Sequence, residues 1–536
     1  KVIVKRLSAI EDLGGIQVLC TDKTGTITEN KLTVTDIFSD DPGSTLKLGI
    51  LAASSLDSKG TPNNSFDVAI IKKLENAYQG LLEGSKKIFE IPFNPNRRRN
   101  SALVKLGGSN QLIVRGAVES VMPYIVGLNS ERNDALMNWV LSIGNQGKRI
   151  IAVAKKSFPK DSYDIPDEEC DLELVGLVAF EDPIKSTTFA AIAKAKELGI
   201  SPKIITGDSA EVAGAVGVKV GIAVSRSDVI TGDDFDLLPH TEQKEILKRI
   251  NVFARISPQQ KYNIIKLLQE DFQVGFLGEG INDAPALRAA GVSIVVDHAA
   301  DVSREVADVI LLKHDLSVIV DGIELGRKTF VNVTNYVKAT LASNFGNFYA
   351  MAFVTLVIDF LPMLPIQILL VNLLSDFPMI SIATDNVARK DILNPKSYSM
   401  RELVLLATIL GLVSTSFDFM MFGVFKPFGE QELQTYWFIG SILTELALIY
   451  SIRTRGWFID FKNPPSKAIL FLTFGAVLLT LAIPFTSVGL ITFKFITPSM
   501  DKLGIIAFIV VGYIASTELV KYVYQKYFSP SSSPSL

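Results

Sequence analysis

Long apolar segments fill the C-terminal third of the chain, and they limit its fold more than any other feature. A helix needs about 20 consecutive apolar residues to cross the hydrocarbon core of a bilayer. The segments that follow Lys328 have about that length, so we expect an all-α transmembrane bundle of six helices. They lie near residues 333–360, 363–384, 402–425, 434–452, 467–486 and 503–524.

Basic residues are unevenly distributed between the loops of this region. A loop with Arg389, Lys390 and Arg401 alternates with loops that hold only Lys426 or Lys494. Cytoplasmic loops of membrane proteins collect Lys and Arg. We therefore predict a multi-pass membrane protein, located in the plasma membrane, whose large N-terminal region faces the cytoplasm.

Composition argues against two other classes of protein. The net charge is −3, whereas nucleic-acid binding requires clustered positive charge, so we expect no nucleic-acid partner. The chain has two cysteines, Cys20 and Cys170, which argues against a disulfide framework.

Three apolar runs in the N-terminal region each end at an acid. These runs lead into Asp22, Asp208 and Glu279. A parallel α/β sheet places its ligand site at the carboxyl ends of neighbouring strands. One buried strand followed by a polar turn is commonplace, but three converging acids predict a site for a cation and a phosphate.

The sharpest motif is Cys-Thr-Asp-Lys-Thr-Gly-Thr at residues 20–26. Asp22 follows a predicted strand, and Gly25 lets backbone amides approach an oxyanion closely. A carboxylate that attacks a γ-phosphoryl group forms an acyl phosphate. A Thr-rich turn that caps a helix would explain a bare Asp-Lys-Thr, but the complete heptapeptide resembles the phosphorylation motif of the P-type ATPases.

The resemblance to P-type cation-transporting ATPases extends over essentially the whole chain. Residues 182–185 resemble the hinge motif of the family, Thr206-Gly207-Asp208 its phosphate-contacting turn, and residues 278–287 its second signature. The family fold implies an α/β haloacid-dehalogenase-like (Rossmann-type) phosphorylation domain with an inserted α+β nucleotide-binding domain. The expected domains are 1–35 and 178–330 for phosphorylation, 36–177 for nucleotide binding, 331–528 for the membrane, and 529–536 for a disordered tail.

The same resemblance implies ATP and Mg²⁺ as cofactors and assigns a set of site residues. Lys261 alone is most simply a solvated surface lysine, but its place before the third acidic strand favours a role in neutralising phosphate. The implied catalytic residues are Asp22, Lys23, Thr24, Thr206, Gly207, Asp208, Lys261, Asn282 and Asp283. The implied Mg²⁺ ligands are Asp22, Thr24, Glu279 and Asp283.

Glu279 departs from the family pattern, which has Asp at this position. The extra methylene moves the carboxylate by about one C–C bond, whereas functional sites tolerate only ~0.5 Å of misplacement. We keep two interpretations: a natural variant with altered kinetics, or a deliberate substitution that stalls turnover.

The predicted insert carries residues that match nucleotide contacts of the family. Phe93 would stack on adenine, Arg115-Gly116 stands where the family has Lys-Gly, and Asp67 and Arg149 match single contact positions. Phe93 would otherwise be a core aromatic residue. For the run 97–99 we expect a solvated basic turn for at least two of its three arginines.

Polar residues within the apolar segments are costly and commonly mark an ion pathway or a contact between helices. Asn344 and Asn347 are three residues apart, and Asn372 and Asp376 are four apart, so each pair lies on one helix face. The pairs resemble the ion site of the family's fifth and sixth helices and would bind a transported divalent cation. Asn347 favours the bacterial magnesium-importing branch, Glu445 favours calcium pumps, and helix packing is an equal alternative for each asparagine.

These patterns together predict ATP-driven cation transport, of magnesium or calcium, through an aspartyl phosphate on Asp22. The chain opens at Lys1 and lacks the family's actuator domain and first four helices, so we expect the missing N-terminal half to be a partner. Two alternatives stay open. One is a membrane-tethered haloacid-dehalogenase-type phosphatase, and the other is a scaffold that Glu279 has impaired.

Overall fold

The structure is a computed structural model in which two compact units are present. One unit comprises Lys1–Arg6 and Ile16–Val320, and the other comprises Leu7–Gly15 and Asp321–Leu536. The predicted tail 529–536 lies outside the described residues. The structure describes residues 2–6, 8–53, 64–74, 85–94, 97–162, 168–313, 315–395 and 400–527.

The larger unit contains an eight-stranded sheet in the order β1-β14-β13-β12-β2-β9-β11-β10. Every neighbouring pair is parallel except β1 and β14. The apolar runs of β2, β12 and β13 are buried along their whole length, as expected for strands that helices cover on both faces. The strands are β1 (Val2–Val4), β2 (Val18–Thr21), β9 (Ser201–Ile205), β10 (Val229–Thr231), β11 (Val252–Ala254), β12 (Val274–Gly278), β13 (Val292–Val296) and β14 (Val309–Leu311).

Helices connect these parallel strands, and α11 is the one that matters most for the site. It begins after Ser257, whose hydroxyl accepts the amide N–H of Gln260 while the Gln260 side chain accepts the Ser257 amide, a capping box. The helices are α7 (Ser186–Glu197), α8 (Ala210–Lys219), α9 (Gly232–Asp236), α10 (His240–Arg249), α11 (Pro258–Leu268), η2 (Ile281–Asp283), α12 (Ala284–Ala289) and α13 (Asp301–Val306).

A second, antiparallel sheet of six strands has the order β3-β8-β7-β6-β5-β4. Its first and last strands in the chain, β3 and β8, pair from Thr33 with Glu181 to Phe38 with Leu177, so the chain enters and leaves this sheet side by side. Gly107 and Gly108 both have positive φ and close the β5–β6 hairpin. The expected domain boundaries at 36 and 177 stay predictions. The elements are β3 (Thr33–Phe38), α2 (Pro42–Leu51), α3 (Ser65–Leu74), β4 (Ser85–Asn94), β5 (Arg99–Leu106), β6 (Ser109–Ala117), α5 (Val118–Val121), η1 (Met122–Tyr124), α6 (Ser130–Asn145), β7 (Arg149–Ser157) and β8 (Glu173–Glu181).

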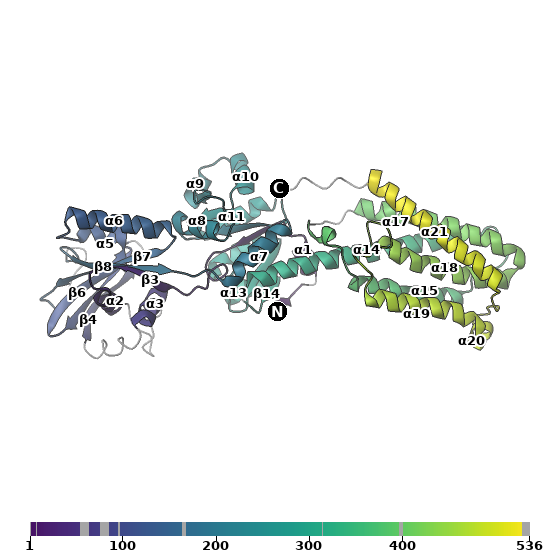
Figure 1. The fold of residues 1–536 in the computed structure, drawn as a ribbon, viewed down its shortest axis with the longest axis horizontal. Coiled ribbons are helices and arrows are strands. Elements are labelled where there is room, and N and C mark those ends of the chain that lie inside the picture. The colour runs from purple at the N-terminus through teal and green to yellow at the C-terminus, as the bar shows by residue number, and fades with distance from the viewer. Residues whose placement is uncertain are drawn as a thin grey trace. The chain divides into compact units, whose positions relative to one another are not determined.

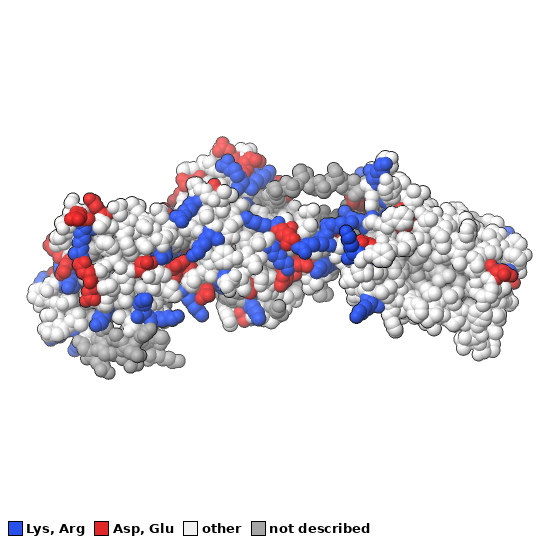
Figure 2. Space-filling view, viewed as in Figure 1, with Lys and Arg blue, Asp and Glu red and all other residues white. Residues whose placement is uncertain are grey.

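The second unit is a helical bundle built around α18, which packs against α15, α17, α19 and α21 (Figure 1). Most α18 side chains are buried. In Figure 2 the flanks of the bundle are largely free of charge, and charged side chains gather at its ends. The helices are α1 (Ser8–Gly14), α14 (Leu316–Val354), α15 (Pro365–Ile380), η3 (Ser381–Thr384), α16 (Arg389–Ile392), α17 (Met400–Phe425), η4 (Lys426–Phe428), α18 (Glu430–Ile452), α19 (Lys467–Ala482), η5 (Ile483–Phe485), α20 (Ser487–Ile491) and α21 (Met500–Tyr527).

Five helices of the described residues are long and apolar enough to cross a membrane, whereas six spans were predicted. They correspond to the last five predicted segments. The first predicted span, 333–360, falls largely in α14, which is 39 residues long but ends at Val354 and is not among the five. Lys338, Asn344 and Asn347 make this helix more polar than the five candidate spans.

Candidate active site

Asp22 directly follows the central strand β2 of the eight-stranded sheet. The neighbours of β2 in the sheet are β12 and β9. Thr21, the last residue of β2, lies opposite Leu277 on one side and Ile204 on the other. The carboxyl ends of these three strands therefore meet at one edge, as the three acidic runs predicted. The Asp22 amide donates to the carbonyl of Leu277, which carries the strand pairing up to the acid itself.

Lys261 links two of the acids at this edge. Its Nζ lies 2.5 Å from Asp22 Oδ2 and 2.8 Å from Asp283 Oδ1. The side chain rises from the first turns of α11 and is buried. Burial alone disfavours the charged ammonium, but Asp22 and Asp283 outweigh it and raise the pKa of Lys261. The lysine is therefore a buried cation beside Asp22 rather than the solvated surface residue it resembles in sequence.

Lys23 makes the matching contact with the second acidic strand. Its Nζ lies 2.9 Å from Asp208 Oδ2 and 4.0 Å from Asp182 Oδ2, and the side chain is 2% exposed. Arg149 forms a second ion pair with Asp208. Burial raises the pKa of Asp208, but Lys23 and Arg149 more than offset this, so the net shift is downward. Asp208 is thus held as an anion by two cations.

The other catalytic candidates lie at the same edge of the sheet but form no ion pair like those of Lys23 and Lys261 among the described residues. The Thr206 hydroxyl accepts the Asp208 amide N–H at 3.3 Å, which shapes the turn after β9. Gly207 and Asn282 are exposed and Thr24 is half-buried. Their backbone positions are at the strand tips, where an anion would meet them.

Glu279 occupies the tip of β12 and lies against the Asp22 loop. Its Oε1 accepts the Thr26 hydroxyl at 3.3 Å, and a Cβ on Gly25, where φ is +78°, would lie 2.6 Å from Oε2. The Asp283 carboxylate accepts the amide of Glu279 at 3.2 Å. Burial raises the pKa of Glu279; Lys185 and the Thr26 hydroxyl lower it, whereas Asp22 and Asp283 raise it further.

The acids fit Mg²⁺ in the kind of donor that they supply, since carboxylate and hydroxyl oxygens are its preferred ligands. The Asp22 and Asp283 carboxylates also repel that of Glu279, and a bound cation would reduce this repulsion. Among the described residues, however, no three His, Cys, Asp or Glu side chains gather closely enough to hold a metal. Lys261 supplies the positive charge between Asp22 and Asp283.

Two residues outside the predicted set contribute to the site. Lys185 donates to the carbonyl of Gly25, and Thr26 donates to Glu279. Burial lowers the pKa of Lys185, against the opposing effect of Glu279, Asp315 and Asp182. In the sequence, Lys185 ends the hinge-like run 182–185, and Thr26 is the last residue of the heptapeptide.

In the six-stranded sheet, Arg115 and Asp67 form a buried ion pair. Arg115 also donates to the carbonyl of Gly49 at 2.9 Å and to Asn100 Oδ1 at 3.1 Å. A Cβ on Gly116 would lie 2.5 Å from the carbonyl of Arg98, so only glycine fits there. Sequence spacing gave no sign of the Asp67–Arg115 pair because the residues lie on different elements.

Phe93 is 55% exposed near the end of β4, so it is not a core aromatic residue. It lies at the same end of the sheet as Gly116, since Asn94 pairs with Arg99 and Arg99 pairs with Gly116. An exposed aromatic ring at this end of the sheet is a suitable platform for a planar base. Arg149, in contrast, is at the start of β7 and contacts Asp208.

The expected solvated basic turn at 97–99 is wrong for two of its three arginines. Arg99 Nε lies 2.8 Å from Glu169 Oε2, and Arg97 Nη1 lies 3.3 Å from Oε1 of the same fully buried acid. Arg99 also stacks on the Tyr124 ring. Only Arg98 has a largely exposed side chain. Glu169 lies about 70 residues away in sequence, and the tertiary fold brings it to the arginines.

In the bundle, Asn347 Nδ2 donates to Glu445 Oε1 at 2.6 Å, which joins α14 to α18. Glu445 is 4% exposed. Asn344, Asn372 and Asp376 are exposed on α14 and α15. The structure therefore brings Asn347 together with Glu445, an acid outside the predicted set of ion ligands.

Comparison with known proteins adds an independent finding. Residues 52–187 match a family model described as P-type ATPase, cytoplasmic domain N, and residues 360–523 match one described as Cation transporting ATPase, C-terminus. The Magnesium-transporting ATPase, P-type 1, of Escherichia coli (strain K12) is 35% identical over 549 residues, which cover 98% of this chain and 60% of that protein. A protein of the same name from Salmonella typhimurium (strain LT2) is 33% identical over 91% of this chain and 56% of its own length. Calcium-transporting ATPase 1 of Lactococcus lactis subsp. lactis is 30% identical over 75% of this chain and 49% of its own length.

A largely parallel sheet with acids at its strand tips, followed by five helices of membrane-spanning length among the described residues, fits a multi-pass membrane protein of the P-type ATPase class. The chain belongs to the P-type cation-transporting ATPases, and its resemblance to the magnesium branch is confirmed. It spans about 60% of the length of the Escherichia coli relative.

Proposed function

We propose that ATP phosphorylates Asp22 and that formation and decay of this aspartyl phosphate drive a divalent cation across the membrane in the whole protein. The observation that carries the proposal is the contact of Lys261 with both Asp22 and Asp283 at adjoining strand tips. We further propose that the eight-stranded sheet is of the haloacid dehalogenase type and that the six-stranded sheet is the nucleotide-binding insert.

The chemistry assigns each contact a role. An Asp22 carboxylate oxygen attacks the γ-phosphorus, the bond from that phosphorus to the β–γ bridging oxygen breaks, and ADP leaves. Lys261, held in place by Asp283, balances the charge that spreads over the transferred group. The Lys23 side chain is held by Asp208. The Lys23 backbone amide donates to Asp22 Oδ1 at 2.6 Å, so it lies beside the nucleophile.

Asp22, Thr24, Glu279 and Asp283 are the residues that would hold Mg²⁺. When bound, the ion neutralises charge on the phosphate groups. Thr206, Gly207 and Asn282 would contact the same phosphate from the neighbouring strand tips. Lys261 offsets the repulsion between the Asp22 and Asp283 carboxylates.

ATP is proposed to bind the six-stranded sheet at the end that carries Phe93 and Gly116. The exposed Phe93 ring offers a stacking surface, and Gly116 lets the backbone at Arg98 and Arg99 pack closely against β6 at this end of the sheet. The buried Asp67–Arg115 pair would hold this end of the sheet in shape. Arg149 is proposed to turn from Asp208 to the nucleotide phosphates.

For the transported ion we propose magnesium, with calcium as the alternative. The relatives named above as magnesium-transporting have the higher identities to this chain, and Asn347 is the residue that the magnesium-importing resemblance singled out. The contact of Asn347 with Glu445 supports an ion site near α14 and α18. Asn344, Asn372 and Asp376 are proposed as its further oxygen ligands.

Phosphorylation from γ-labelled ATP and Mg²⁺, stopped with acid, tests the proposal. We expect label that is acid-stable and hydroxylamine-labile, and that is absent from Asp22→Asn. Label that persists in Asp22→Asn would refute Asp22 as the nucleophile. Phosphatase activity on small phosphate esters without ATP binding would favour the haloacid-dehalogenase-type phosphatase, and ATP binding with no label in wild type or in Glu279→Asp would favour a scaffold.

A further inference from the structure

One lysine of the eight-stranded sheet is buried but takes no part in the proposed chemistry. Lys203 is the third residue of β9 and is 2% exposed. Its Nζ donates to the Ile250 carbonyl at 2.8 Å and to Asn251 Oδ1 at 2.7 Å. Both acceptors are neutral, and among the described residues no Asp or Glu pairs with Lys203. A buried ammonium without an acid beside it costs free energy, which favours a role beyond packing.

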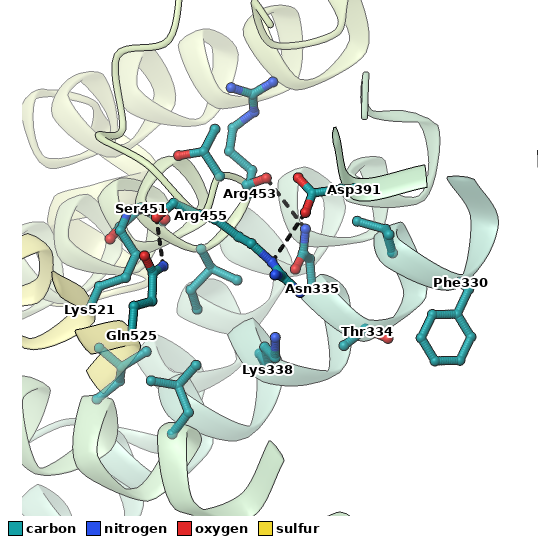
Figure 3. Close-up of a pocket in the computed structure, with 15 residues that line it drawn as sticks. Phe330, Thr334, Asn335, Lys338, Asp391, Ser451, Arg453, Arg455, Lys521 and Gln525 are labelled. Atoms are coloured by element: carbon teal, nitrogen blue, oxygen red, sulfur yellow. Dashed lines mark hydrogen bonds and ion pairs between the residues drawn. The ribbon is translucent and has the colours of Figure 1, made fainter. Parts of the chain in front are cut away.

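Cations elsewhere in the protein commonly lie beside an acid. In the pocket of the helical bundle that Figure 3 shows, Arg455 Nε lies 3.1 Å from Asp391 Oδ1. The neighbouring Arg453 is buried and pairs with Asp385. Lys203 differs from these residues because a carbonyl and an amide accept its hydrogen bonds, so no anion balances its charge.

The surroundings of Lys203 favour the loss of its proton. Burial lowers the pKa of Lys203 from its ordinary 10.5 to about 8, against a smaller opposing effect of Cys20. Cys20 lies opposite Lys203 in the pairing of β2 with β9, and burial raises the pKa of its thiol to about 12. Among the described residues on β2, β11 and α7, the elements packed against β9, Cys20 is the titratable group that acts on Lys203. The thiol is therefore neutral where Lys203 changes its charge.

The acceptors of Lys203 lie where α10 ends and β11 begins. Ile250 is the C-cap of α10, and a cation at the C-terminus of a helix is favoured by the helix dipole. Ile204, next to Lys203 on β9, donates its amide to the Asn251 carbonyl at 2.8 Å. We name the contacts of Lys203 with Ile250 and Asn251 the β11 tie. The tie holds the start of β11 against β9.

The other end of β11 leads to groups of the candidate active site. The Arg255 amide donates to the Asp208 carbonyl at 2.8 Å, and the Ile256 amide donates to the Thr206 carbonyl at 3.0 Å. These two bonds shape the turn 206–208. The helix α11, which carries Lys261, follows directly. The β11 tie therefore acts, through one short strand, on both the turn 206–208 and Lys261.

We propose that Lys203 is a positioning residue for the phosphorylation of Asp22. Its ammonium holds the start of β11 and so sets the positions of the turn 206–208 and of Lys261. Hydrogen bonds from a charged donor are roughly twice as strong as neutral ones, so a neutral amine holds the strand less firmly. Phosphorylation should then slow as the pH rises and Lys203 loses its proton. This inference rests on the proposed function.

Loss of this proton makes the fold more stable rather than less. The folded pKa of Lys203 lies below the ordinary 10.5, so between about pH 8 and 10.5 the unfolded chain binds more protons than the folded protein. The contribution of this group to stability therefore rises with pH over that range. A slower reaction over the same range would come from the position of β11 and not from unfolding.

Rapid-quench labelling of the full chain with γ-labelled ATP, between about pH 7 and pH 9, tests this role. We expect the wild-type rate to fall by about fivefold, with a midpoint near pH 8, because the neutral form of Lys203 is about tenfold slower. Lys203→Met should be about tenfold slower at about pH 7 and should lose this fall. Lys203→Arg, which stays cationic, should be faster than Lys203→Met and should also lose the fall. Lys196→Met is the matched control with a wild-type profile, because this exposed lysine of α7 also donates to a carbonyl, that of Gly221.

Hydrogen exchange measures the hold on β11 without ATP. Peptides that cover residues 252–256 should exchange at least about threefold faster in Lys203→Met than in wild type or in Lys196→Met. The wild-type protein should show a similar increase from about pH 7 to pH 9, after correction for the intrinsic exchange rate. This last comparison needs no variant and decides the case in which Lys203→Met fails to fold.

The outcomes separate this inference from the proposed function. Absence of label in wild type at every pH would refute the proposed function, and the exchange of β11 would then decide whether the tie holds the strand. Label that follows the same pH profile in wild type and in Lys203→Met would overturn the positioning role of Lys203. Exchange of β11 that is unchanged both in the variant and in wild type across the pH range would overturn it as well.

Discussion

Lys261 Nζ lies 2.5 Å from Asp22 Oδ2, although the two residues are 239 positions apart in the sequence. The contact places a buried cation against the proposed nucleophile, so its removal should leave Asp22 and Asp283 without the charge between them. We expect Lys261→Met to lower the rate of phosphoenzyme formation by about 10²–10³-fold, the effect of removing one charge-stabilising donor. Lys261→Arg should recover only part of the rate, because a planar guanidinium does not replace a compact ammonium.

Rapid-quench labelling with γ-labelled ATP measures this rate. Circular dichroism and ATP binding serve as the controls for folding. A wild-type rate in Lys261→Met would show that the contact is structural only.

Glu279 lies against Gly25 and accepts the Thr26 hydroxyl. Glu279→Asp shortens the acid by one methylene and withdraws it from this loop, towards the position that the family pattern gives it. We expect the labelling rate to rise by at least about tenfold, since a 1 Å misplacement costs up to 10²-fold. Thr26→Val removes only the hydroxyl contact and so separates the effect of this hydrogen bond from that of the length of the acid. Unchanged kinetics in Glu279→Asp would show that the longer acid is neutral.

The pH dependence of stability should report the burial of Glu279. Its pKa is raised above the ordinary 4.5 by burial, so the folded protein binds more protons than the unfolded chain above pH 4.5. The stability from this group is fully present below pH 4.5 and is lost as pH rises through the folded pKa. Glu279→Gln removes that loss, so its Tm should exceed that of wild type at neutral pH, and the difference should shrink towards pH 4.5. Thermal melts in the presence of a metal chelator measure it, and parallel profiles across this range would contradict the prediction.

The buried pair of Arg115 and Asp67 should be sensitive to the loss of one partner. Arg115→Ala leaves a buried carboxylate unpaired, and we expect a local loss of about 3–5 kcal/mol in the six-stranded sheet. Arg115→Met combined with Asp67→Leu removes both charges and should recover most of that stability. Hydrogen exchange of β6 measures the local effect. Arg98→Ala, an exposed arginine on the adjacent turn, should change it by less than ~0.5 kcal/mol, and an equal loss there would refute the role of the buried pair.

The contact of Asn347 with Glu445 should govern the response to the transported cation. Asn347→Ala removes a donor that orients the acid, and we expect the apparent cation affinity, measured from phosphoenzyme levels, to fall by about 10–100-fold. Glu445→Gln should lower the apparent cation affinity further if the carboxylate itself binds the ion. Ser416→Ala is the control, because this exposed hydroxyl donates to the Leu412 carbonyl of its own helix. Unaltered cation dependence in both variants would place the ion site elsewhere.

Local pattern was enough for much of the site. An apolar run followed by an acid can be recognised residue by residue, and the three strands that carry Asp22, Asp208 and the Glu279 segment are neighbours in the sheet. The apolar segments likewise gave five of the six expected spans. The exception is α14, where Lys338, Asn344 and Asn347 lower the hydropathy on which the prediction depended.

Pairings between distant residues were beyond the sequence. Nothing near Arg97 or Arg99 pointed to Glu169, and nothing near Arg115 pointed to Asp67, because each partner arrives on another element of the fold. The same limit hid the contact of Asn347 with Glu445.

The sequence by itself determined the strand-tip acids, the heptapeptide and the membrane segments, since all of these are written in short runs whose periodicity and burial are local properties. Only the tertiary structure decided which cation meets which acid. Lys261, an ordinary lysine in the chain, is a buried partner of Asp22 because α11 and β2 are brought together by the sheet, and an ion pair depends on that distance rather than on spacing along the sequence.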